Sequence, residues 1–320
     1  MRVLITGGLG FIGQNLATYL RRLEKDIELV ALDWFEDACS TEFEDACSTE
    51  KALFDEVHTS CFVADEIMDQ YLTADVVVHL AAYTTVQESI LNPLRSFNNN
   101  VVKTQKLLEF LRLNTPETKL VFASTGGAII GDYDGAINER IAANPLSPYG
   151  ANKLAVEGLL SAYAGSYGLN TASMRFSNVY GPHSWRKSSV VSSFSRMYLQ
   201  EGVLQINGDG LQTRDYIFVD DICDAIYRVI RKDGRGVFQL GTGIGTSILE
   251  IADIFKSLDP SRKTELKYVD GLPGEVRHNK ADISRIRSEL NFNPNFTVQR
   301  GIRNTVDWFK NYKNTLVEKS

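Results

Sequence analysis

The chain begins with MRVLITGGLGFIG, residues 1–13, and this stretch decides the fold. Residues 2–6 form a short apolar run that predicts a buried parallel strand. Apolar residues then recur at helical spacing along residues 12–20, which predicts a helix. A strand and a helix joined by a glycine-dense turn are typical of the first unit of a doubly wound α/β sheet.

The turn holds four glycines whose spacing predicts a phosphate-binding site. Gly8, Gly10 and Gly13 fit the pattern G-x-G-x-x-G, and Gly7 extends it to G-x-x-G-x-x-G. Because glycine has no side chain, a pyrophosphate can approach the backbone at the helix N-terminus, where N–H groups have no helical partner. An ordinary tight turn also uses glycine, so the assignment depends on its context. The cofactor contacts predicted here are those of Gly7, Gly10, Phe11, Ile12 and Gly13.

The next strand ends in a carboxylate that supplies this context. Residues 27–32 form a second apolar run, and Asp33 follows it directly, twenty residues beyond Gly13. A carboxylate at this place would accept hydrogen bonds from a ribose 2′-OH and would repel a 2′-phosphate. The sequence therefore predicts a dinucleotide site that prefers NAD to NADP.

The composition excludes several classes of protein. With 320 residues, 43% of them hydrophobic and 23% charged, the chain is typical of a globular protein with a large core. No apolar run has the length of a transmembrane helix, and a strand at residue 2 leaves no room for a secretory signal, so we expect a cytoplasmic protein without a membrane partner. Lys and Arg number 34 against 40 Asp and Glu, and the net charge of -6 offers no broad cationic surface to nucleic acid.

Two further features carry no catalytic signal. The cysteines and histidines lack the spacing of metal ligands, so we expect reduced thiols and no metal site. Residues 35–42, FEDACSTE, are repeated letter for letter as residues 43–50, which is too short a period for a solenoid and favours a local duplication in an exposed loop. The cysteines are Cys39, Cys47, Cys61 and Cys223.

Further apolar runs alternate with helical patterns, as in a parallel doubly wound sheet. They cover residues 57–63, 75–80 and 119–124. Asp65 follows the first of them and would reach the adenine of a bound dinucleotide. The second leads into HLAAY, residues 79–83, whose small side chains would let a cofactor lie against the backbone. The cofactor contacts predicted there are Leu80, Ala81 and Ala82.

A long helical pattern at residues 93–113 contains three consecutive asparagines. An asparagine on the sheet side of this helix needs a polar partner because a buried amide without one is costly. We assign that position, and a contribution to the cofactor site, to Asn100.

Residues 147–153, SPYGANK, open another predicted helix and place Tyr149 and Lys153 on one helical face. A phenol has a pKa of about 10 and is a poor base at neutral pH. A neighbouring ammonium and a positive nicotinamide ring would stabilise the phenolate, and a pKa shift of about three units corresponds to about 4 kcal/mol. Tyr149 is therefore the predicted general base. The alternative, for this pair taken alone, is a surface tyrosine over a lysine stem.

The run 119–124 leads into ASTGG, residues 123–127, at the carboxyl edge of the sheet, where ligands bind in such folds. Ser124 and Thr125 are the candidate hydroxyls for hydrogen bonding to a substrate oxygen. The sequence leaves the choice between them open, and Ser124 is also a candidate cofactor contact.

The motifs occur in a fixed order, and together they resemble the extended short-chain dehydrogenase/reductases that act on nucleotide sugars. The resemblance covers nearly the whole chain. It implies a Rossmann-like NAD-binding domain, residues 1–176 with 215–245 returning to it, and a smaller α/β nucleotide-sugar domain, residues 177–214 and 246–320. It rests on GGLGFIG, Asp33, HLAAY, AST, PYGANK, MRFSNVYGP (174–182), GDGLQTRDYIFVDD (208–221), LGTG (240–243) and PGEVRHNKAD (273–282).

The resemblance also implies substrate contacts and a homodimer formed through the helices at 93–113 and 148–167. Asn178 would contact the diphosphate of a nucleotide sugar, and Arg214 and Arg277 would pair with its phosphates, because a guanidinium fork matches phosphate oxygens. An alternative for Arg214 is an ion pair with Asp215 or Asp220. The remaining implied contacts are Ser177 for the cofactor and Ser189, Val190 and Asn207 for the nucleotide.

Two positions bear on substrate choice. Leu272 stands where the family often has arginine, and the sequence leaves open whether Arg277 replaces that phosphate contact. Asn279 aligns with a position that limits the sugar pocket, where a tyrosine accompanies plain hexoses and a small residue accompanies an N-acetyl group. Asparagine is nearer the small end, so we expect activity on UDP-N-acetylglucosamine as well as on UDP-glucose.

The loop after Thr125 favours one reaction. The related 4,6-dehydratases have an Asp-Glu pair there, and the UDP-glucuronate decarboxylases have a Glu close by, whereas this chain has Gly126 and Gly127. With Thr125, Tyr149 and Lys153 alone, we expect reversible oxidation at C4 by an NAD-dependent UDP-hexose 4-epimerase. The alternatives are a dehydratase, or a UDP-glucuronate decarboxylase or epimerase, of the same family, an enzyme that releases NADH, and a non-catalytic sensor of NAD or nucleotide sugars.

Overall fold

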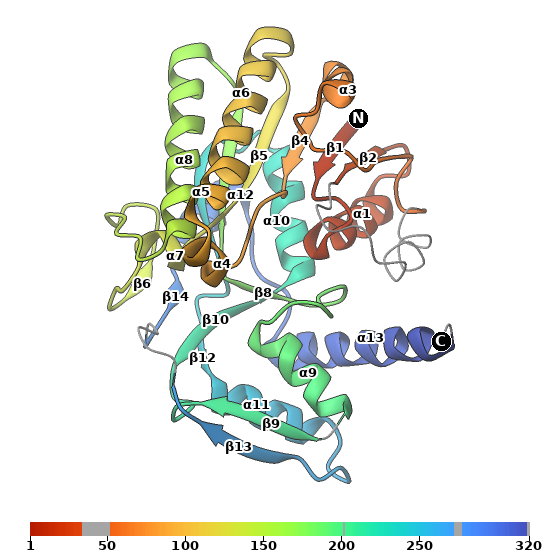
Figure 1. Cartoon of the computed structure of the whole chain (residues 1–320), viewed down its shortest axis with the longest axis vertical. Helices are drawn as coiled ribbons and strands as arrows, with labels where there is room; N and C mark the ends of the chain where they lie inside the picture. The colour runs from red at the N-terminus through yellow and green to blue at the C-terminus, as the bar shows by residue number, and fades with distance from the viewer. Residues whose placement is uncertain (34–51, 201, 272–276, 319–320) are drawn as a thin grey trace.

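The computed structural model describes residues 1–33, 52–200, 202–271 and 277–318 (Figure 1). Its centre is a seven-stranded sheet in the order β11-β7-β5-β4-β1-β2-β3, and every neighbouring pair is parallel. Chain order runs outward in both directions from β1 and β4, so the expected Rossmann-like topology is confirmed, with its switch point between these strands. The strands are β1 Arg2–Thr6, β2 Glu28–Leu32, β3 Glu56–His58, β4 Val76–His79, β5 Lys119–Thr125, β7 Thr171–Phe176 and β11 Gly236–Leu240.

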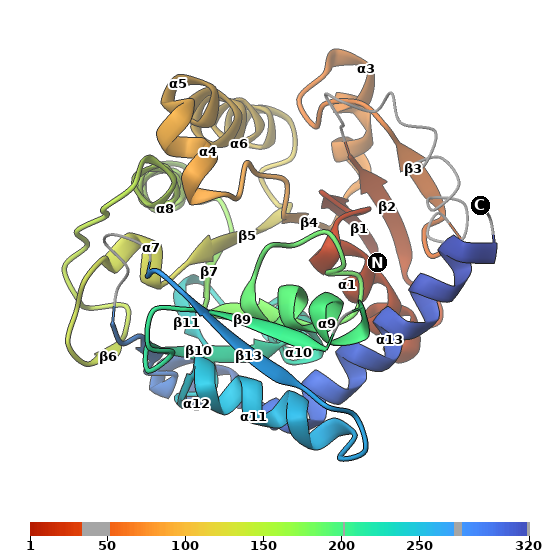
Figure 2. The same cartoon turned by 60° about the horizontal axis from the view of Figure 1, so that its bottom comes forward.

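Helices cover both faces of this sheet, because alternate strand residues point to opposite sides and both sides are apolar. Ile5 of β1 packs in one cluster with Leu16 and Ile222, whereas the preceding residue, Leu4, packs in another with Leu108. Figure 2 shows α4, α5, α6 and α8 together on one side of the sheet. The helices of this part are α1 Phe11–Leu23, α3 Asp65–Met68, η1 Asp69–Thr73, α4 Val86–Leu91, α5 Pro93–Phe97, η2 Asn98–Val102, α6 Lys103–Asn114, α7 Gly127–Ile130, α8 Pro148–Tyr167, α10 Val219–Arg231 and α12 Ser284–Leu290.

Two elements differ from their predicted extent. The strand expected at 57–63 ends at His58, because the chain then turns, with the Ala64 N–H bonded to Cys61 O, and buries Phe62 in the core. The helix expected at 93–113 is divided into α5, a π-helical turn η2 and α6. A π turn shifts the backbone hydrogen-bond ladder by one residue and is frequent at functional sites.

A second group of elements lies below the sheet in Figure 1 and builds its own core. Strands β12-β10-β8 form one small sheet and β13-β9 another. Their core contains Phe194, Ile206, Phe255 and Ile302, all buried. The elements are β8 Asn178–Tyr180, α9 Val190–Gln200, β9 Val203–Asn207, β10 Thr213–Phe218, β12 Gly245–Ser247, α11 Ile248–Leu258, β13 Glu265–Val269 and α13 Val298–Glu318, and β6 Ala136–Ile137 pairs with β14 Lys280–Ala281.

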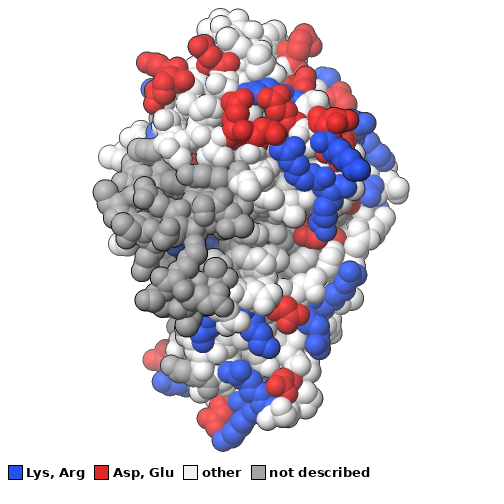
Figure 3. All heavy atoms as spheres, turned by 90° about the vertical axis from the view of Figure 1, so that its right-hand side faces the viewer, with Lys and Arg blue, Asp and Glu red and all other residues white. Residues whose placement is uncertain are grey.

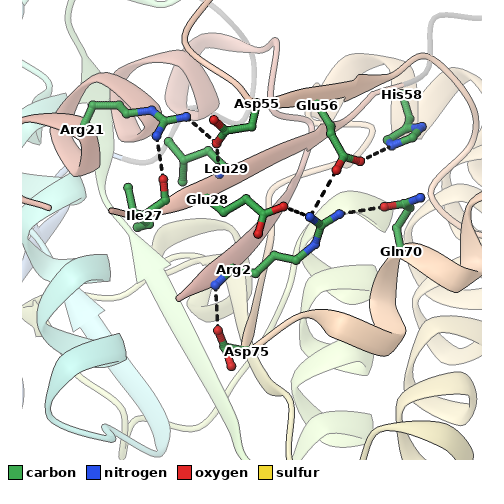
Figure 4. A network of polar contacts seen from close by, with 10 residues as sticks. All are labelled: Arg2, Arg21, Ile27, Glu28, Leu29, Asp55, Glu56, His58, Gln70 and Asp75. Carbon is green, nitrogen blue, oxygen red and sulfur yellow. Dashed lines mark hydrogen bonds and ion pairs between the residues drawn. The ribbon is translucent and has the colours of Figure 1, made fainter. Parts of the chain in front are cut away.

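A polar network fastens the amino ends of β1, β2 and β3 (Figure 4). The guanidinium of Arg2 contacts Glu28 and, at 3.2 Å, Glu56, and it donates to Gln70 Oε1 at 2.8 Å. Arg21 of α1 donates to Asp55 at 2.5 Å, and Asp55 in turn accepts the Leu29 N–H. This network stabilises the sheet at the edge opposite to the carboxyl ends of its strands, where ligands bind in such folds.

On the face drawn in Figure 3, acidic and basic side chains lie close to one another rather than in one field of a single sign. Among the described residues, no helix combines the length and apolar character needed to cross a bilayer. Cys61 and Cys223 are free thiols. Cys39, Cys47 and the repeated FEDACSTE segment lie outside the described residues.

Candidate active site

The glycine turn packs against the segment that follows β4. Gly7 has φ 71°, and a Cβ on it would lie 2.9 Å from Ala81 N, so the turn and the segment touch backbone to backbone. A Cβ on Gly13 would collide with the carbonyl oxygens of Gly7 and Gly8. Helix α1 starts against this turn only because both positions lack a side chain.

The first turn of α1 offers free donors that fit a pyrophosphate. Its N-cap, Gly10, provides no side-chain acceptor, and the first turn contains no acidic residue. Among the described residues, the N–H groups of Phe11, Ile12 and Gly13 have no acceptor, and the first helical bond is that of Gln14 N–H to Gly10 O. Unpaired N–H groups at a helix N-terminus attract anions, so the donor set matches the phosphates of NAD.

Asp33 lies at the carboxyl end of β2, beside the same turn. Its Oδ2 accepts the Leu9 N–H at 2.9 Å, and its own N–H donates to His58 O at 2.9 Å. One carboxylate oxygen therefore holds the glycine turn in place. Asp65 is exposed at the start of α3, and its contact with adenine stays a prediction.

Asn100 is 3% exposed and has the polar partners that its burial requires. Its Oδ1 accepts the Tyr83 N–H at 2.8 Å, and its Nδ2 donates to Tyr83 O at 3.0 Å and to Ser96 Oγ at 3.4 Å. The amide therefore fixes the backbone of the segment after β4, which includes Leu80, Ala81 and Ala82. Its predicted contribution to the cofactor site would act through this segment.

The amino end of α8 is pressed against the loop after β5. Ser147 caps the helix by accepting the Gly150 N–H at 3.2 Å, and a Cβ on Gly150 would collide with Ala128 O. The Tyr149 N–H donates to Ser89 Oγ at 3.1 Å. These contacts fix the start of the helix and with it the backbone that carries the phenol.

Lys153 is buried one helical turn beyond Tyr149. Its Nζ donates to Ala123 O at 2.8 Å and lies 4.5 Å from the centre of the Phe122 ring and 5.9 Å from that of Tyr149. Burial lowers the pKa of Lys153 to about 7, although the charge of Glu157 acts in the opposite direction. Lys153 is thus held close to the phenol ring.

The lowering of the Tyr149 pKa expected beside an ammonium and a nicotinamide ring stays a prediction, because it depends on bound NAD. Burial raises the pKa of Tyr149 to about 12, because a phenolate loses its hydration in the site. The positive charge that would reverse this shift has to come from a bound nicotinamide ring together with protonated Lys153.

The two candidate hydroxyls point to different surroundings. Ser124 is 4% exposed and donates to Glu157 Oε1 at 2.6 Å. Glu157 also pairs with Arg175 through three hydrogen bonds of 2.7 to 3.1 Å. Thr125 is partly exposed as a residue, and its hydroxyl has no hydrogen bond to another described residue. Among the described residues, the Ser124 hydroxyl thus has a partner that the Thr125 hydroxyl lacks.

Residues that the motifs did not single out support the loop of Thr125. A Cβ on Gly126 would collide with the amide of Gln239, which is 1% exposed and donates to Arg175 O at 3.2 Å. A Cβ on Gly127 would collide with Asn279 Nδ2. The signal for Glu157 was its place four residues after Lys153 on the same helical face, whereas Arg175 and Gln239 have no sequence signal because only strand pairing brings them together.

Ser177, Asn178 and Arg214 belong to the segments that meet at β8 and β10, where Arg214 donates to Thr213 O at 2.8 Å. Asn178 Nδ2 donates to Asp215 O at 3.4 Å, and the Ser177 N–H donates to Leu240 O at 2.9 Å. Asp215 accepts backbone N–H groups, and Asp220 pairs with an arginine of α1. The alternative ion pair of Arg214 with Asp215 or Asp220 is therefore not formed among the described residues. The donors to Asp215 are Thr242, Gly243 and Ala281.

The other predicted substrate contacts are more dispersed. Arg277 makes a bidentate ion pair with Asp209, at 3.0 and 2.7 Å, so a phosphate would have to compete with this carboxylate. Ser189 is exposed and donates to Ser192 Oγ, next to Val190 at the start of α9. Asn207 ends β9, and its carbonyl accepts from Gln212. Leu272 lies outside the described residues.

The sequence matches one protein family over most of its length. The model of the NAD dependent epimerase/dehydratase family matches residues 3–241. The UDP-glucose 4-epimerase of Mycolicibacterium smegmatis is 34% identical over 322 residues, which cover 97% of this chain and 99% of that protein. The UDP-glucuronate 4-epimerase of Thermodesulfobacterium geofontis is 29% identical over 313 residues, covering 96% and 95%.

Solved structures give the same picture. The UDP-glucose 4-epimerase of Thermotoga maritima, determined with UDP-glucose, superimposes with a TM-score of 0.87 at 29% identity and covers 98% of this chain and all of that one. The UDP-glucuronic acid 4-epimerase of Bacillus cereus, determined with UDP-glucuronic acid and NAD, gives 0.86 at 27% identity, covering 98% and 100%. The similarity thus extends to two substrate classes.

Proposed function

The chain belongs to the NAD-dependent epimerase/dehydratase family, and from this premise we propose that it is a UDP-hexose 4-epimerase. The proposed substrates are UDP-glucose and UDP-galactose, and the proposed reaction is a transient oxidation at C4. The relatives named above include both UDP-glucose and UDP-glucuronate epimerases, so the proposal rests on the site itself.

The observation that carries the proposal is the loop of Thr125, Gly126 and Gly127. Elimination of water from C6 requires an acid and a base in addition to the group that acts at C4. Gly126 and Gly127 bring no carboxylate to this loop, and Asn279 Nδ2 lies where a Cβ on Gly127 would stand. Two acids with contacts near this loop have other partners, because Glu157 pairs with Arg175 and Glu139 accepts the Gln239 N–H.

Tyr149 would take the proton of the sugar O4, and Thr125 would hydrogen-bond the same oxygen. Lys153 would stabilise the phenolate through its charge, from its position beneath the phenol ring. NAD, when bound, accepts the hydride of C4 and returns it to the opposite face of the 4-keto sugar, so that no net oxidation occurs. Glu157 would hold Ser124, and Gln239 would hold the loop at Gly126.

Asn279 supports a wider choice of sugar. Its amide lies against Gly127, at the mouth of the loop that carries Thr125. A side chain of this size leaves more room beside the loop than a tyrosine, so we propose that UDP-N-acetylglucosamine is a substrate as well.

An apolar surface on α4 and α5 supports a homodimer. Ile90, Leu91 and Leu94 are 58, 77 and 78% exposed, and both helices pack against α8. We propose that a second copy covers this surface, because an apolar patch of this kind is otherwise costly in water. Sedimentation analysis should find a dimer, and Leu94→Glu should give monomers. A monomeric wild-type chain at micromolar concentration would refute the dimer.

The proposed reaction is tested by incubating the protein with UDP-glucose, UDP-galactose, UDP-N-acetylglucosamine and UDP-glucuronate, followed by chromatography and proton NMR of the products. We expect interconversion of the two hexoses and of the N-acetylated pair, without accumulation of NADH. Conversion of UDP-glucuronate alone would favour the glucuronate epimerases, and a 4-keto-6-deoxy product would identify a dehydratase.

A further inference from the structure

A histidine that the proposed reaction does not use lies at the centre of a buried hydrogen-bond chain. His79 ends β4 and is 1% exposed, between the rings of Phe62 and Phe122. Its Nδ1 lies 2.6 Å from Thr6 Oγ1, and its Nε2 lies 3.0 Å from Thr104 Oγ1. Both imidazole nitrogens therefore have a hydroxyl partner, one on β1 and the other on α6.

The other partners of these hydroxyls determine where each proton lies. Thr104 Oγ1 donates to Asn100 O at 2.7 Å, so it can only accept from His79, and the imidazole proton is on Nε2. Thr6 Oγ1 accepts the Ala81 N–H at 3.2 Å and donates its own proton to Nδ1. Burial, and next the charge of Lys153, lower the pKa of His79 to about 3, which agrees with a neutral ring.

Both ends of the hydrogen-bond chain through His79 hold the segment proposed to bind NAD. At one end, the Ala81 N–H is fixed where Ala81 N lies against Gly7 of the glycine turn. At the other end, Asn100 belongs to the π-helical turn η2, and its amide holds the backbone of Tyr83. His79 thus connects the two anchors of residues 80–83 through hydroxyls on β1 and α6.

We infer that His79 is a positioning residue for the cofactor, whose fixed neutral tautomer locks residues 80–83 in the conformation that binds NAD. The inference rests on the cofactor site proposed above, but not on the identity of the sugar or of the reaction. Removal of the Thr6 or the Thr104 hydroxyl leaves one imidazole nitrogen of His79 buried without a partner. It also removes the hydrogen bond of that hydroxyl to Ala81 N–H or to Asn100 O.

The first test compares two substitutions of Thr104. Thr104→Val removes the hydroxyl and keeps the shape, so we expect the NAD dissociation constant, measured by calorimetry on protein stripped of cofactor, to rise by about tenfold or more. Thr104→Ser keeps the hydroxyl and should bind NAD like the wild type. Thr6→Val and Thr6→Ser form a second pair that reports on the other end of the chain.

A matched control separates positioning from stability. Thr118 is 5% exposed and donates to Ala74 O at 2.9 Å, at the amino end of β5, away from the cofactor segment. Thr118→Val should lower the urea midpoint about as much as Thr104→Val and leave NAD binding unchanged. Wild-type NAD affinity in Thr104→Val, or an equal loss of affinity in Thr118→Val, would overturn the inference. These outcomes do not depend on turnover of any sugar.

The second test observes the tautomer. In protein labelled with ¹⁵N-histidine, His79 should show a protonated Nε2 and an unprotonated Nδ1, with shifts that stay constant from about pH 5 to about pH 8. The His79→Gln variant assigns its signals among those of the four histidines. A proton on Nδ1, or a titration near the ordinary value of 6.5, would also overturn the inference.

Discussion

Ser124 Oγ donates to Glu157 Oε1 at 2.6 Å, and this bond separates the functions of two adjacent hydroxyls. Ser124 faces the buried ion pair of Glu157 with Arg175, whereas Thr125, the next residue of the strand, faces the opposite side. We therefore propose Thr125, rather than Ser124, as the hydroxyl that contacts the substrate.

The first prediction concerns these two hydroxyls. Thr125→Ala should lower kcat by about 10²- to 10³-fold, because it removes a donor to the reacting oxygen. Ser124→Ala should keep kcat within about threefold of the wild type and lower the free energy of unfolding by about 1–3 kcal/mol, because Glu157 loses one partner. Steady-state kinetics and urea titration measure both quantities. The opposite assignment of kcat effects would make Ser124 the substrate contact.

The second prediction concerns the buried ion pair. The side chains of Arg175 and Glu157 are 7 and 5% exposed. Glu157→Gln should lower the free energy of unfolding by about 3–5 kcal/mol, because it leaves the guanidinium buried without its charge partner. Asp253→Asn, which breaks an exposed pair with Lys256, is the control and should cost about 0–1 kcal/mol. Equal losses in the two urea titrations would show that the buried pair has no special role.

The third prediction is a pH dependence. Burial lowers the pKa of Lys153 from 10.5 to about 7, so the folded chain binds fewer protons than the unfolded chain between these values. The free energy of unfolding of the wild type should therefore rise with pH through this window. Below about pH 7 the full cost of burying a charged lysine remains. The Lys153→Met variant has no buried lysine and does not bear this cost.

The stability of Lys153→Met relative to the wild type should accordingly be higher at about pH 6 than at about pH 9, while its activity is lost at both. Urea titrations of both proteins at the two pH values measure the difference. Lys256→Met, at an exposed lysine, should show no such change. A pH-independent difference for Lys153→Met would mean that the lysine keeps its ordinary pKa in the folded chain.

The fourth prediction concerns the sugar pocket. Asn279→Tyr places a large ring beside Gly127, against the loop of Thr125. We expect kcat/KM for UDP-N-acetylglucosamine to fall by about tenfold or more, with kcat/KM for UDP-glucose changed by less than about threefold. Asn279→Ser, which stays small, is the control. A parallel loss for both sugars would show that the position does not select the N-acetyl group.

Periodicity and glycine spacing predicted the parallel sheet, the start of α1 and the helix of Tyr149, because these depend on neighbours close in sequence. The end of β3 at His58 and the π turn at Asn98–Val102 were not predicted, because both follow from tertiary packing. The partner of Arg277 is another case, since Asp209 is distant in sequence. The raised pKa of Tyr149 is a consequence of burial that no spacing reveals.

Within the site, adjacent residues such as Ser124 and Thr125 are equivalent as letters and become distinct only when strand alternation and Glu157 are known. The same holds for His79, whose role depends on hydroxyls contributed by two other elements. The sequence thus predicted the candidate side chains, and the fold shows that two neighbours among them have different surroundings.

The most direct test of the central claim is the fate of the hydrogen at C4. UDP-glucose labelled with deuterium at C4 is incubated with the protein, and the product is analysed by NMR and mass spectrometry. The account predicts UDP-galactose that retains deuterium at C4, because the hydride returns to the carbon that it left. Loss of deuterium to solvent, or a product whose C4 configuration is unchanged, would contradict it.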